Sequence, residues 1–184
     1  KGIGKLKRLH DLIVRNNRLK ALPESVCELR SLGFFTASNN NITTLPENIG
    51  NLENLHIFLA WQNNLNRLPN RIGRMKAVRH ADFRYNNLTA LPASLSLWSS
   101  IESFKLTGNP VCAGMRKQEL PTNLQTVRES LCTKECAVNC PSFGVGDGDC
   151  DDDEYIYSLT KSFDSSARPK SQAGCNTKTC NDDG

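Results

Sequence analysis

Apolar residues recur along the first half of the chain with an unbroken spacing of 23 residues. The residues that start each unit are all apolar: Leu9, Leu32, Leu55, Val78 and Ile101. Three and five residues after each start stand further apolar residues, such as Leu12 and Val14 in the first unit and Phe58 and Ala60 in the third. This alternation predicts a short strand with one buried face in every unit. A fixed period of this length predicts a solenoid of stacked units.

An asparagine always stands eight positions after the start of a unit: Asn17, Asn40, Asn63, Asn86 and Asn109. Its side chain both donates and accepts hydrogen bonds, so stacked asparagines can satisfy backbone groups where each strand leaves the sheet. A Leu-Pro pair follows in four units, of which Leu22-Pro23 is the first. Each proline ends the extended run and predicts a turn or short helix on the side opposite the sheet.

These residues resemble the leucine-rich repeat, pattern LxxLxLxxNxLxxLPxxIGxLxx, over residues 1 to about 112. The resemblance implies an α/β solenoid with a curved parallel β-sheet on its concave side and irregular segments on its convex side. Ile3, Gly4 and Leu6 already fit the end of a repeat. We therefore expect the chain to begin inside a repeat and to be a fragment.

The strand positions between the buried residues point outward, and we call the surface they form the concave face. Several of its residues are apolar or aromatic and stand beside charged ones, and we predict that these bind a ligand: Phe34, Ile57, Leu59, Trp61, His80, Asp82, Arg84 and Tyr85. Exposed apolar clusters tend to mark contacts, and aromatic and arginine anchors are typical of protein interfaces. The alternative is that Ile57, Leu59 and Trp61 only pack on neighbouring strands.

Charge divides the chain into two halves. Residues 1–111 carry 15 Lys and Arg against 7 Asp and Glu, whereas residues 112–184 carry 8 against 12. The basic residues of the first half are spread over several segments rather than gathered in one column, so we expect no nucleic-acid partner. If they contribute to binding, an acidic protein or a glycan is at least as good a target. No apolar run approaches the roughly 20 residues of a membrane span.

Cysteine is also unevenly distributed, because seven of the 8 cysteines follow residue 111. We predict a solenoid over 1–111, a cap over 112–134 and a cysteine-rich module over 135–184. The resemblance to secreted leucine-rich repeat proteins implies a Cys112–Cys132 disulfide that closes the cap over the solenoid end. Cys27 stands where other repeats have glycine or serine, so we predict a free, buried thiol. Cysteine use of this kind indicates an oxidising compartment.

The last 50 residues resemble the Notch-type LNR module, on Cys136-x3-Cys140, Asp147-Gly148-Asp149-Cys150-Asp151, Cys175-Asn176-x3-Cys180 and Asp183-Gly184. The resemblance implies a small, loop-rich and disulfide-rich module around one calcium ion, with Asp147 and Asp183 as ligands. It also implies the pairs Cys136–Cys180 and Cys140–Cys175, which leaves Cys150 without a partner. The family's final Asp-Cys, and with it a third ligand, is absent. Residues 152–174 are an insert that we interpret as a polar loop.

Two other metal sites fit these residues less well, and one alternative needs no metal. An EF-hand that starts at Asp147 requires glycine at its sixth position and an acid at its twelfth, where Asp152 and Ser158 stand. Zinc is disfavoured because the two-residue cysteine spacing of zinc knuckles is missing. The alternative is that 147–154 is only a solvated acidic loop.

No group of residues in the sequence suggests catalysis, and we expect that the chain is not an enzyme. Its three histidines lie in the repeats, without a nucleophile motif or a phosphate-binding loop. We predict an extracellular module, secreted or part of a membrane protein's ectodomain, that binds a protein or peptide. The sequons Asn41-Ile42-Thr43 and Asn87-Leu88-Thr89 agree with a glycoprotein. The alternatives are the sensor region of a larger membrane signalling enzyme, such as a receptor kinase, and an intracellular scaffold.

Overall fold

The computed structural model describes residues 2–114, 121–125 and 131–132. The chain divides into two units, Lys1–Lys134 and Glu135–Gly184, and every described residue belongs to the first. The predicted LNR-like module over 135–184, with its calcium ligands, disulfide pairs and insert, therefore lies outside the described residues.

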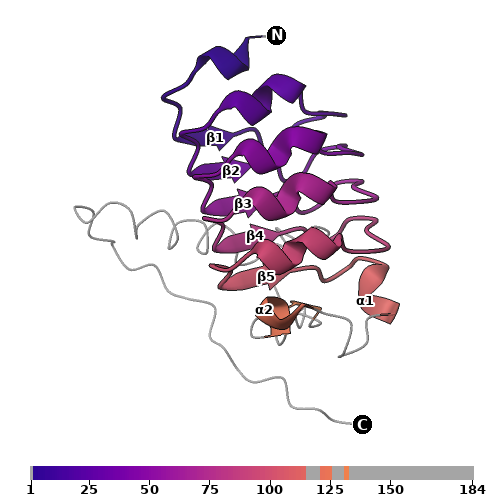
Figure 1. Ribbon diagram of the computed structural model, residues 1–184. Coiled ribbons are helices and arrows are strands. Elements are labelled where there is room, and N and C mark those ends of the chain that lie inside the picture. Colours follow the sequence, from indigo (N-terminus) through magenta and orange to yellow (C-terminus); the bar gives the residue numbers. More distant parts are fainter. Residues whose placement is uncertain (1, 115–120, 126–130, 133–184) are drawn as a thin grey trace, which may run out of the picture. The chain divides into compact units, whose positions relative to one another are not determined.

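Five strands form one parallel sheet in the described part of the chain, in the order in which they occur along the sequence. They are β1 (Asp11–Ile13), β2 (Phe34–Thr36), β3 (Ile57–Leu59), β4 (His80–Asp82) and β5 (Ser103–Lys105). Each residue lies opposite the one 23 positions on, as Leu12 lies opposite Phe35. The predicted parallel sheet is thus confirmed, and Figure 1 shows its strands stacked one above another.

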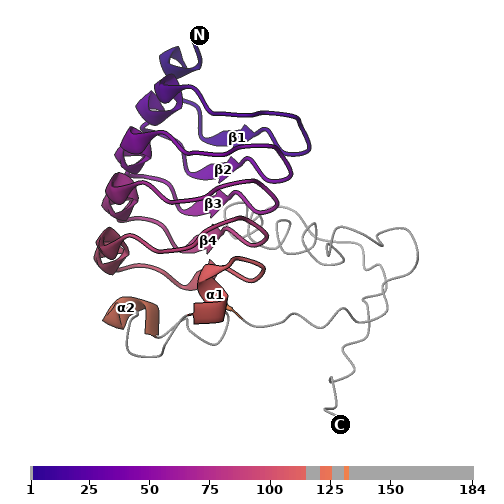
Figure 2. The same ribbon diagram turned by 90° about the vertical axis from the view of Figure 1, so that its right-hand side faces the viewer.

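A 3-10 helix lies on the other side of each repeat: η1 (Ile3–Lys5), η2 (Glu24–Glu28), η3 (Glu47–Asn51), η4 (Asn70–Arg74) and η5 (Ala93–Leu97). The last four each follow a proline, whose φ lies between −55° and −70°. The leucine, methionine or tryptophan that ends each of these four donates its N–H three residues back, as Leu52 does to Ile49. The predicted short helices are therefore present and are of the 3-10 type. Figure 2 shows them along one side of the stack.

The core fills the space between the sheet and the 3-10 helices. A row of aromatic rings runs through it, in which Phe35 and Phe58 stack with their centroids 5.2 Å apart. Phe83 then meets both Phe58 and Phe104 edge to face. In the fourth repeat the phenylalanine, Phe83, stands just beyond β4, two positions later than in the second and third repeats, and Ala81 occupies the earlier place. The row continues because the small and large residues exchange places within one repeat.

The asparagines form a continuous ladder at the strand ends, as predicted. The Nδ2 amide of Asn63 donates to the carbonyls of Ala60 and Trp61 in its own repeat and of Ala37 in the preceding one. Its Oδ1 accepts the N–H of Ile42 at 2.9 Å. Asn40, Asn86 and Asn109 repeat most of this arrangement, each binding groups 21 and 26 positions back. One side chain thus joins each repeat to the one before it.

The 3-10 helices approach one another so closely that two positions admit only glycine. A Cβ on Gly50 would lie 1.9 Å from the carbonyl oxygen of Arg71, and one on Gly73 would lie 2.0 Å from that of Ser94. Cys27 occupies the equivalent place in η2, where it is buried and free, as predicted. Burial raises the pKa of its thiol to about 12, helped by the charge of Glu24. A thiol in this state is inert.

The end of the solenoid is closed by two single-turn helices, α1 (Val111–Gly114) and α2 (Thr122–Gln125). The predicted Cys112–Cys132 disulfide is present, with its Cα atoms 5.6 Å apart. Asn123 donates to the carbonyls of Leu95 and Trp98 at 2.9 Å each. No helix in the described residues is both long enough and apolar enough to cross a membrane.

Candidate functional site

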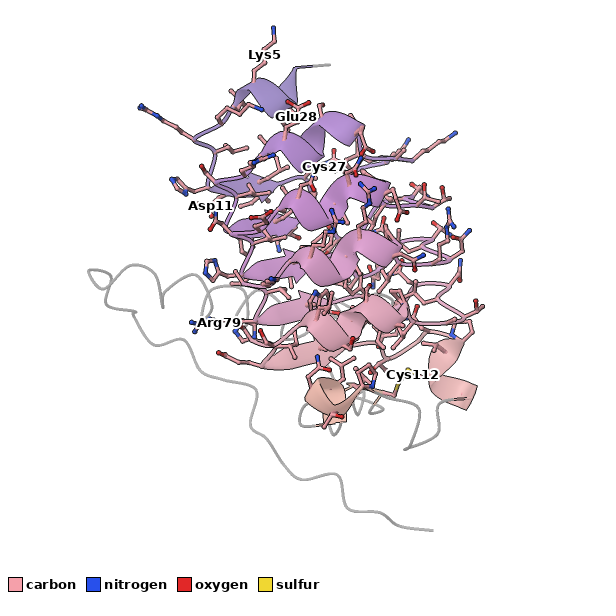
Figure 3. The ribbon with its side chains drawn as sticks, in the orientation of Figure 1. Lys5, Asp11, Cys27, Glu28, Arg79 and Cys112 are labelled. Carbon is pink, nitrogen blue, oxygen red and sulfur yellow. A yellow bond between two sulfur atoms is a disulfide. The ribbon has the colours of Figure 1, made fainter. Side chains whose placement is uncertain are left out.

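The strand register arranges the predicted binding residues in columns across the sheet. Phe34 lies opposite Ile57, and Ile57 lies opposite His80, while Leu59 lies opposite Asp82. Beyond the strands, backbone bonds keep the same spacing, because Gln62 N–H donates to the carbonyl of residue 84 at 2.9 Å. Asp11 of β1 lies on this strand side, while Glu28 lies on the side of the 3-10 helices (Figure 3). The fold therefore places the predicted residues on one face of β2–β4.

The expectation that the apolar residues of this face are exposed is wrong. Phe34 keeps 5%, Ile57 2%, Leu59 2% and Trp61 4% of its surface exposed. None of the four belongs to the hydrophobic core cluster. Adjacent parallel strands lie only about 4.8 Å apart, so in-register neighbours pack along the sides of each residue but do not cover its outer end. The pattern of the sequence identified the face on which these residues lie, but not how little of them reaches solvent.

Asp82 and Arg84 form a buried ion pair within one edge of this face. They stand two positions apart, so they project from the same side of the chain. Both oxygens of Asp82 accept from Nε of Arg84, and Oδ2 lies 2.8 Å from a terminal guanidinium nitrogen. Both side chains are about 4% exposed. Both residues belong to the predicted site, but their pairing was not predicted, although their opposite charges and spacing could have indicated it.

His80 lies half-buried beside this pair, on β4. Its Nε2 is 3.6 Å from a carboxylate oxygen of Glu102, whose other oxygen lies 3.4 Å from Arg79. Burial lowers the pKa of His80, and the charge of Arg79 acts in the same direction, while Glu102 opposes them. Burial is the largest of these effects, so the imidazole is neutral at neutral pH.

Four residues that follow the strands have a left-handed backbone: Asn16, Asn39, Gln62 and Tyr85. This conformation is uncommon for residues other than glycine and is least expected of a bulky one such as Tyr85, whose φ is 53°. The next residue of this column is Gly108, and a Cβ there would lie 2.5 Å from the ring of Tyr85. The ring therefore rests on a glycine and remains 39% exposed. Tyr85 is the accessible aromatic member of the predicted site.

An open polar recess lies at the ends of β1 and β2, outside the predicted site. It is lined by Asn16, Asn17, Arg18 and Asn39. Nδ2 of Asn39 donates to Oδ1 of Asn16 at 2.9 Å across it. Its members come from the loop after each strand, and no motif in the sequence marks them as a group.

The calcium ligands predicted at Asp147 and Asp183 lie outside the described residues. Within residues 2–114, 121–125 and 131–132, no group of three or more His, Cys, Asp or Glu side chains could hold a metal ion. The predicted calcium site thus stays a prediction.

Comparison with solved structures shows a leucine-rich repeat fold. The chain is similar to the ectodomain of the Arabidopsis thaliana receptor kinase GASSHO1/SCHENGEN3, solved with CASPARIAN STRIP INTEGRITY FACTOR 2, at 29% identity and a TM-score of 0.56 over 59% of this chain. The plant peptide hormone receptor RGFR1, solved with RGF2, has 23% identity and a TM-score of 0.51 over 56% of this chain. A Leptospira interrogans LRR protein has 26% identity over 72% of this chain, with a TM-score of 0.49.

The chain spans only a part of each of these proteins, namely 13%, 17% and 38% of their lengths in the same order. No protein-family model matches the sequence, and no curated protein matches it. The likeness therefore concerns the repeat architecture, and the activities of the longer proteins do not transfer with it.

Proposed function

We propose that this chain is an extracellular recognition module that binds a protein or peptide on the concave face of its repeats. The observation that carries the proposal is the group of four apolar side chains, Phe34, Ile57, Leu59 and Trp61, that lie outside the core cluster. Packing of the solenoid does not require apolar residues at these places, because the core lies on the other side of the sheet. Tryptophan and tyrosine side chains beside an arginine are typical anchors of a protein interface.

The polar neighbours of this group suit a partner that offers both apolar and polar groups. Tyr85 is exposed at one edge, and His80 and the Asp82–Arg84 pair lie beside it. Since little of the four apolar side chains reaches solvent in the chain by itself, a partner that contacts them must first expose them. Binding of this kind is slower than the docking of two preformed surfaces.

One comparison agrees with a ligand-binding role. The receptor kinase ectodomain that resembles this chain at 29% identity was solved with CASPARIAN STRIP INTEGRITY FACTOR 2. It is the ectodomain of a plant membrane receptor, which favours an extracellular setting for this chain as well. The Cys112–Cys132 disulfide supports the same compartment, since such bonds persist in oxidising surroundings.

We propose further that residues 135–184 form an LNR-like appendage that binds calcium through Asp147 and Asp183. This part of the proposal rests on the cysteine and acid spacing alone. Hard carboxylate oxygens suit calcium. Calorimetric titration of calcium into the full chain, compared with Asp147→Asn, tests it. Absence of binding heat in the wild type would exclude the calcium site, and identical binding heats from both proteins would show that Asp147 is not a ligand.

The test of the binding face uses a displayed peptide library panned against the immobilised full chain. Trp61→Ala with Tyr85→Ala should weaken the selected peptides by about 2 kcal/mol or more, roughly 30-fold in Kd. Leu97→Ala is the control for loss of a large apolar side chain, because Leu97 is 53% exposed but lies on η5. Arg84 is left intact, since its removal would leave Asp82 buried without its ion pair. Equal affinities for the variant and the wild type would place the binding surface elsewhere.

A second candidate is that the chain is the sensor region of a larger membrane signalling enzyme. The likeness to a receptor kinase ectodomain favours it, and binding on the concave face would be the same in both cases. A third candidate, an intracellular scaffold, makes a different prediction for the cysteines. Mass spectrometry without reductant, on protein from its native source, should find Cys112 joined to Cys132 if the chain is extracellular and should find free thiols if it is a scaffold.

A further inference from the structure

Two tripeptides at the strand-exit edge of the solenoid share one local structure. Asn41-Ile42-Thr43 and Asn87-Leu88-Thr89 follow ladder asparagines by one position and lie two repeats apart. The N–H of Asn41 donates to the carbonyl of Leu19 at 2.9 Å, and that of Asn87 donates to Leu65 at 2.8 Å. The backbone of each acceptor asparagine is therefore fixed to the preceding repeat.

The side chains of each tripeptide alternate between the core and the solvent. The central residues Ile42 and Leu88 are fully buried, and their N–H groups donate to Asn63 and Asn109. The flanking asparagine and threonine are exposed in both tripeptides. In an extended segment, residues two apart project to the same side. An amide and a hydroxyl thus stand together on the outer surface twice.

Asn64-Leu65-Asn66 in the repeat between them is a natural reference. Asn64 N–H donates to the carbonyl of Ile42 at 2.9 Å, Leu65 is fully buried, and both flanking residues are exposed. The structure at this place equals that of the two sequons, but residue 66 is not a threonine. The three sites thus differ at their third residue, where Asn66 lacks the hydroxyl of Thr43 and Thr89.

We propose that Asn41 and Asn87 carry N-linked glycans, which emerge from the same edge of the solenoid two repeats apart. This inference rests on the extracellular location proposed above. In the modification, Nδ2 of the asparagine forms a bond to the anomeric carbon of a lipid-diphosphate-linked oligosaccharide. The bond from that carbon to the lipid diphosphate breaks, the lipid diphosphate leaves, and one amide proton is lost. Attached sugars at exposed positions such as these are compatible with the folded repeats.

The repeat spacing separates the two attachment points by about 10 Å, since neighbouring strands lie about 4.8 Å apart. Both points lie on the exit edge and not on the concave face, because the intervening residues Ile42 and Leu88 belong to the core. A partner that binds β2–β4 would therefore approach a face that bears no sugar.

The experiment expresses the full chain through a eukaryotic secretory pathway and measures its intact mass before and after an amidase removes N-linked sugars. The wild type should lose two glycans, and Thr43→Ala and Thr89→Ala should each retain one while keeping both asparagines. Asn66→Thr should gain a third glycan at Asn64. Each variant should keep the thermal unfolding midpoint of the sugar-free wild type, because only exposed side chains change.

A secreted chain that holds the Cys112–Cys132 bond yet loses no mass on treatment would overturn this inference and leave the proposed location intact. A native protein with free thiols would instead overturn the proposed location. Gain of a glycan in Asn66→Thr, with none at Asn41 or Asn87, would also contradict the proposal, because the three sites share one backbone.

Discussion

The pairing of Asp82 with Arg84 neutralises two charges on the concave face and leaves His80 as its titratable residue near neutral pH. Two hydrogen bonds from one guanidinium nitrogen and a 2.8 Å contact from another fix the carboxylate. A buried pair of this kind is costly to break, because removal of one partner leaves an unpaired charge. The face thus combines apolar side chains with a charge pair that is fixed in position.

At this scale we predict that acid weakens the fold through His80. Burial lowers the pKa of its imidazole below the value of about 6.5 in an unfolded chain. The folded state therefore binds fewer protons, so its stability is complete above about pH 6.5 and falls as the pH decreases through that value. Urea unfolding at pH 7.5 and 5.5 should show a drop in the free energy of unfolding that is smaller in His80→Gln.

Glu102 must remain in both proteins of this comparison, because its carboxylate opposes the effect of burial. Glu102→Gln in the wild-type background should enlarge the acid-induced drop. An identical pH dependence in wild type and His80→Gln would show that the histidine has the same pKa in both states.

Single residues were predictable where one position has one role. The asparagines were identified because an amide is the side chain that can both donate to and accept from a strand end, and the ladder confirms it. The exposure of Trp61 and Ile57 was not predictable, since alternation along a strand reports only the side on which a residue projects. Solvent exposure depends on what lies above that side, which has no periodic signature.

The 3-10 helices pack against one another through glycine on the convex side. A side chain at residue 50 would meet the backbone carbonyl of Arg71, which is itself held in η4. Neighbouring helices can therefore stack only at the spacing that the glycine permits. This contact couples the convex side to the sheet, because both must keep the same repeat distance.

Gly50→Ala should lower the free energy of unfolding by about 1–3 kcal/mol, the usual cost of overpacking, because its Cβ would lie 1.9 Å from a backbone oxygen. Gly33→Ala is the control, since its nearest neighbours would lie 3.8 and 3.9 Å away and its φ is not left-handed. That change should be neutral or stabilising by about 0.4–1 kcal/mol. Chemical denaturation measures the free energy of unfolding of both variants. Equal values for Gly50→Ala and Gly33→Ala would show that the packing of the 3-10 helices tolerates a side chain at residue 50.

The elements themselves were largely predictable from spacing. Alternation over three to five residues identified every strand, and Leu-Pro identified the start of each helix from η2 to η5. The helix type was not predictable, because five residues between each proline and the next core residue are too few for periodicity to separate 3-10 from α. The ring row through Phe83 was also missed, since it depends on packing across repeats.

The cap forms hydrogen bonds to the last repeat at two places, and in each the two partners are more than 20 residues apart in the sequence. The N–H of Leu106, just beyond β5, donates to the carbonyl of Leu131 at 2.7 Å, and Asn123 binds the end of η5. A sheet edge that is left open invites other strands to pair with it. The Cys112–Cys132 bond lies next to Leu131, whose carbonyl pairs with this edge.

For the whole solenoid we predict that Cys112→Ser with Cys132→Ser lowers the free energy of unfolding by about 2–4 kcal/mol, as expected for a loop of this size. Unfolding should begin at the cap. Hydrogen exchange of the Leu106 amide should therefore accelerate more than that of amides in β2. Cys27→Ala is the control, because it removes the other described cysteine without touching the cap. Uniform acceleration along the sheet in the double variant would contradict a local role for the disulfide.

At the scale of the whole molecule, the repeats were predictable because their pattern recurs, and the Cys112–Cys132 disulfide was predictable from the resemblance to secreted leucine-rich repeat proteins. The module predicted over 135–184 depends on a resemblance with an insert and an incomplete end, and it lies outside the described residues. A solenoid repeats its sequence pattern several times, so each repeat supports the prediction of the others. A loop-rich module offers its pattern only once.

The asparagine ladder limits how the length of this protein can change. Every bond by which a ladder asparagine joins its repeat to the one before spans one of two offsets, 21 or 26 positions. Removing or duplicating 23 residues restores all of these partners, whereas any other change of length breaks the bonds on one side of the junction. Insertions and deletions that the body of the solenoid tolerates should therefore add or remove whole repeats of 23 residues.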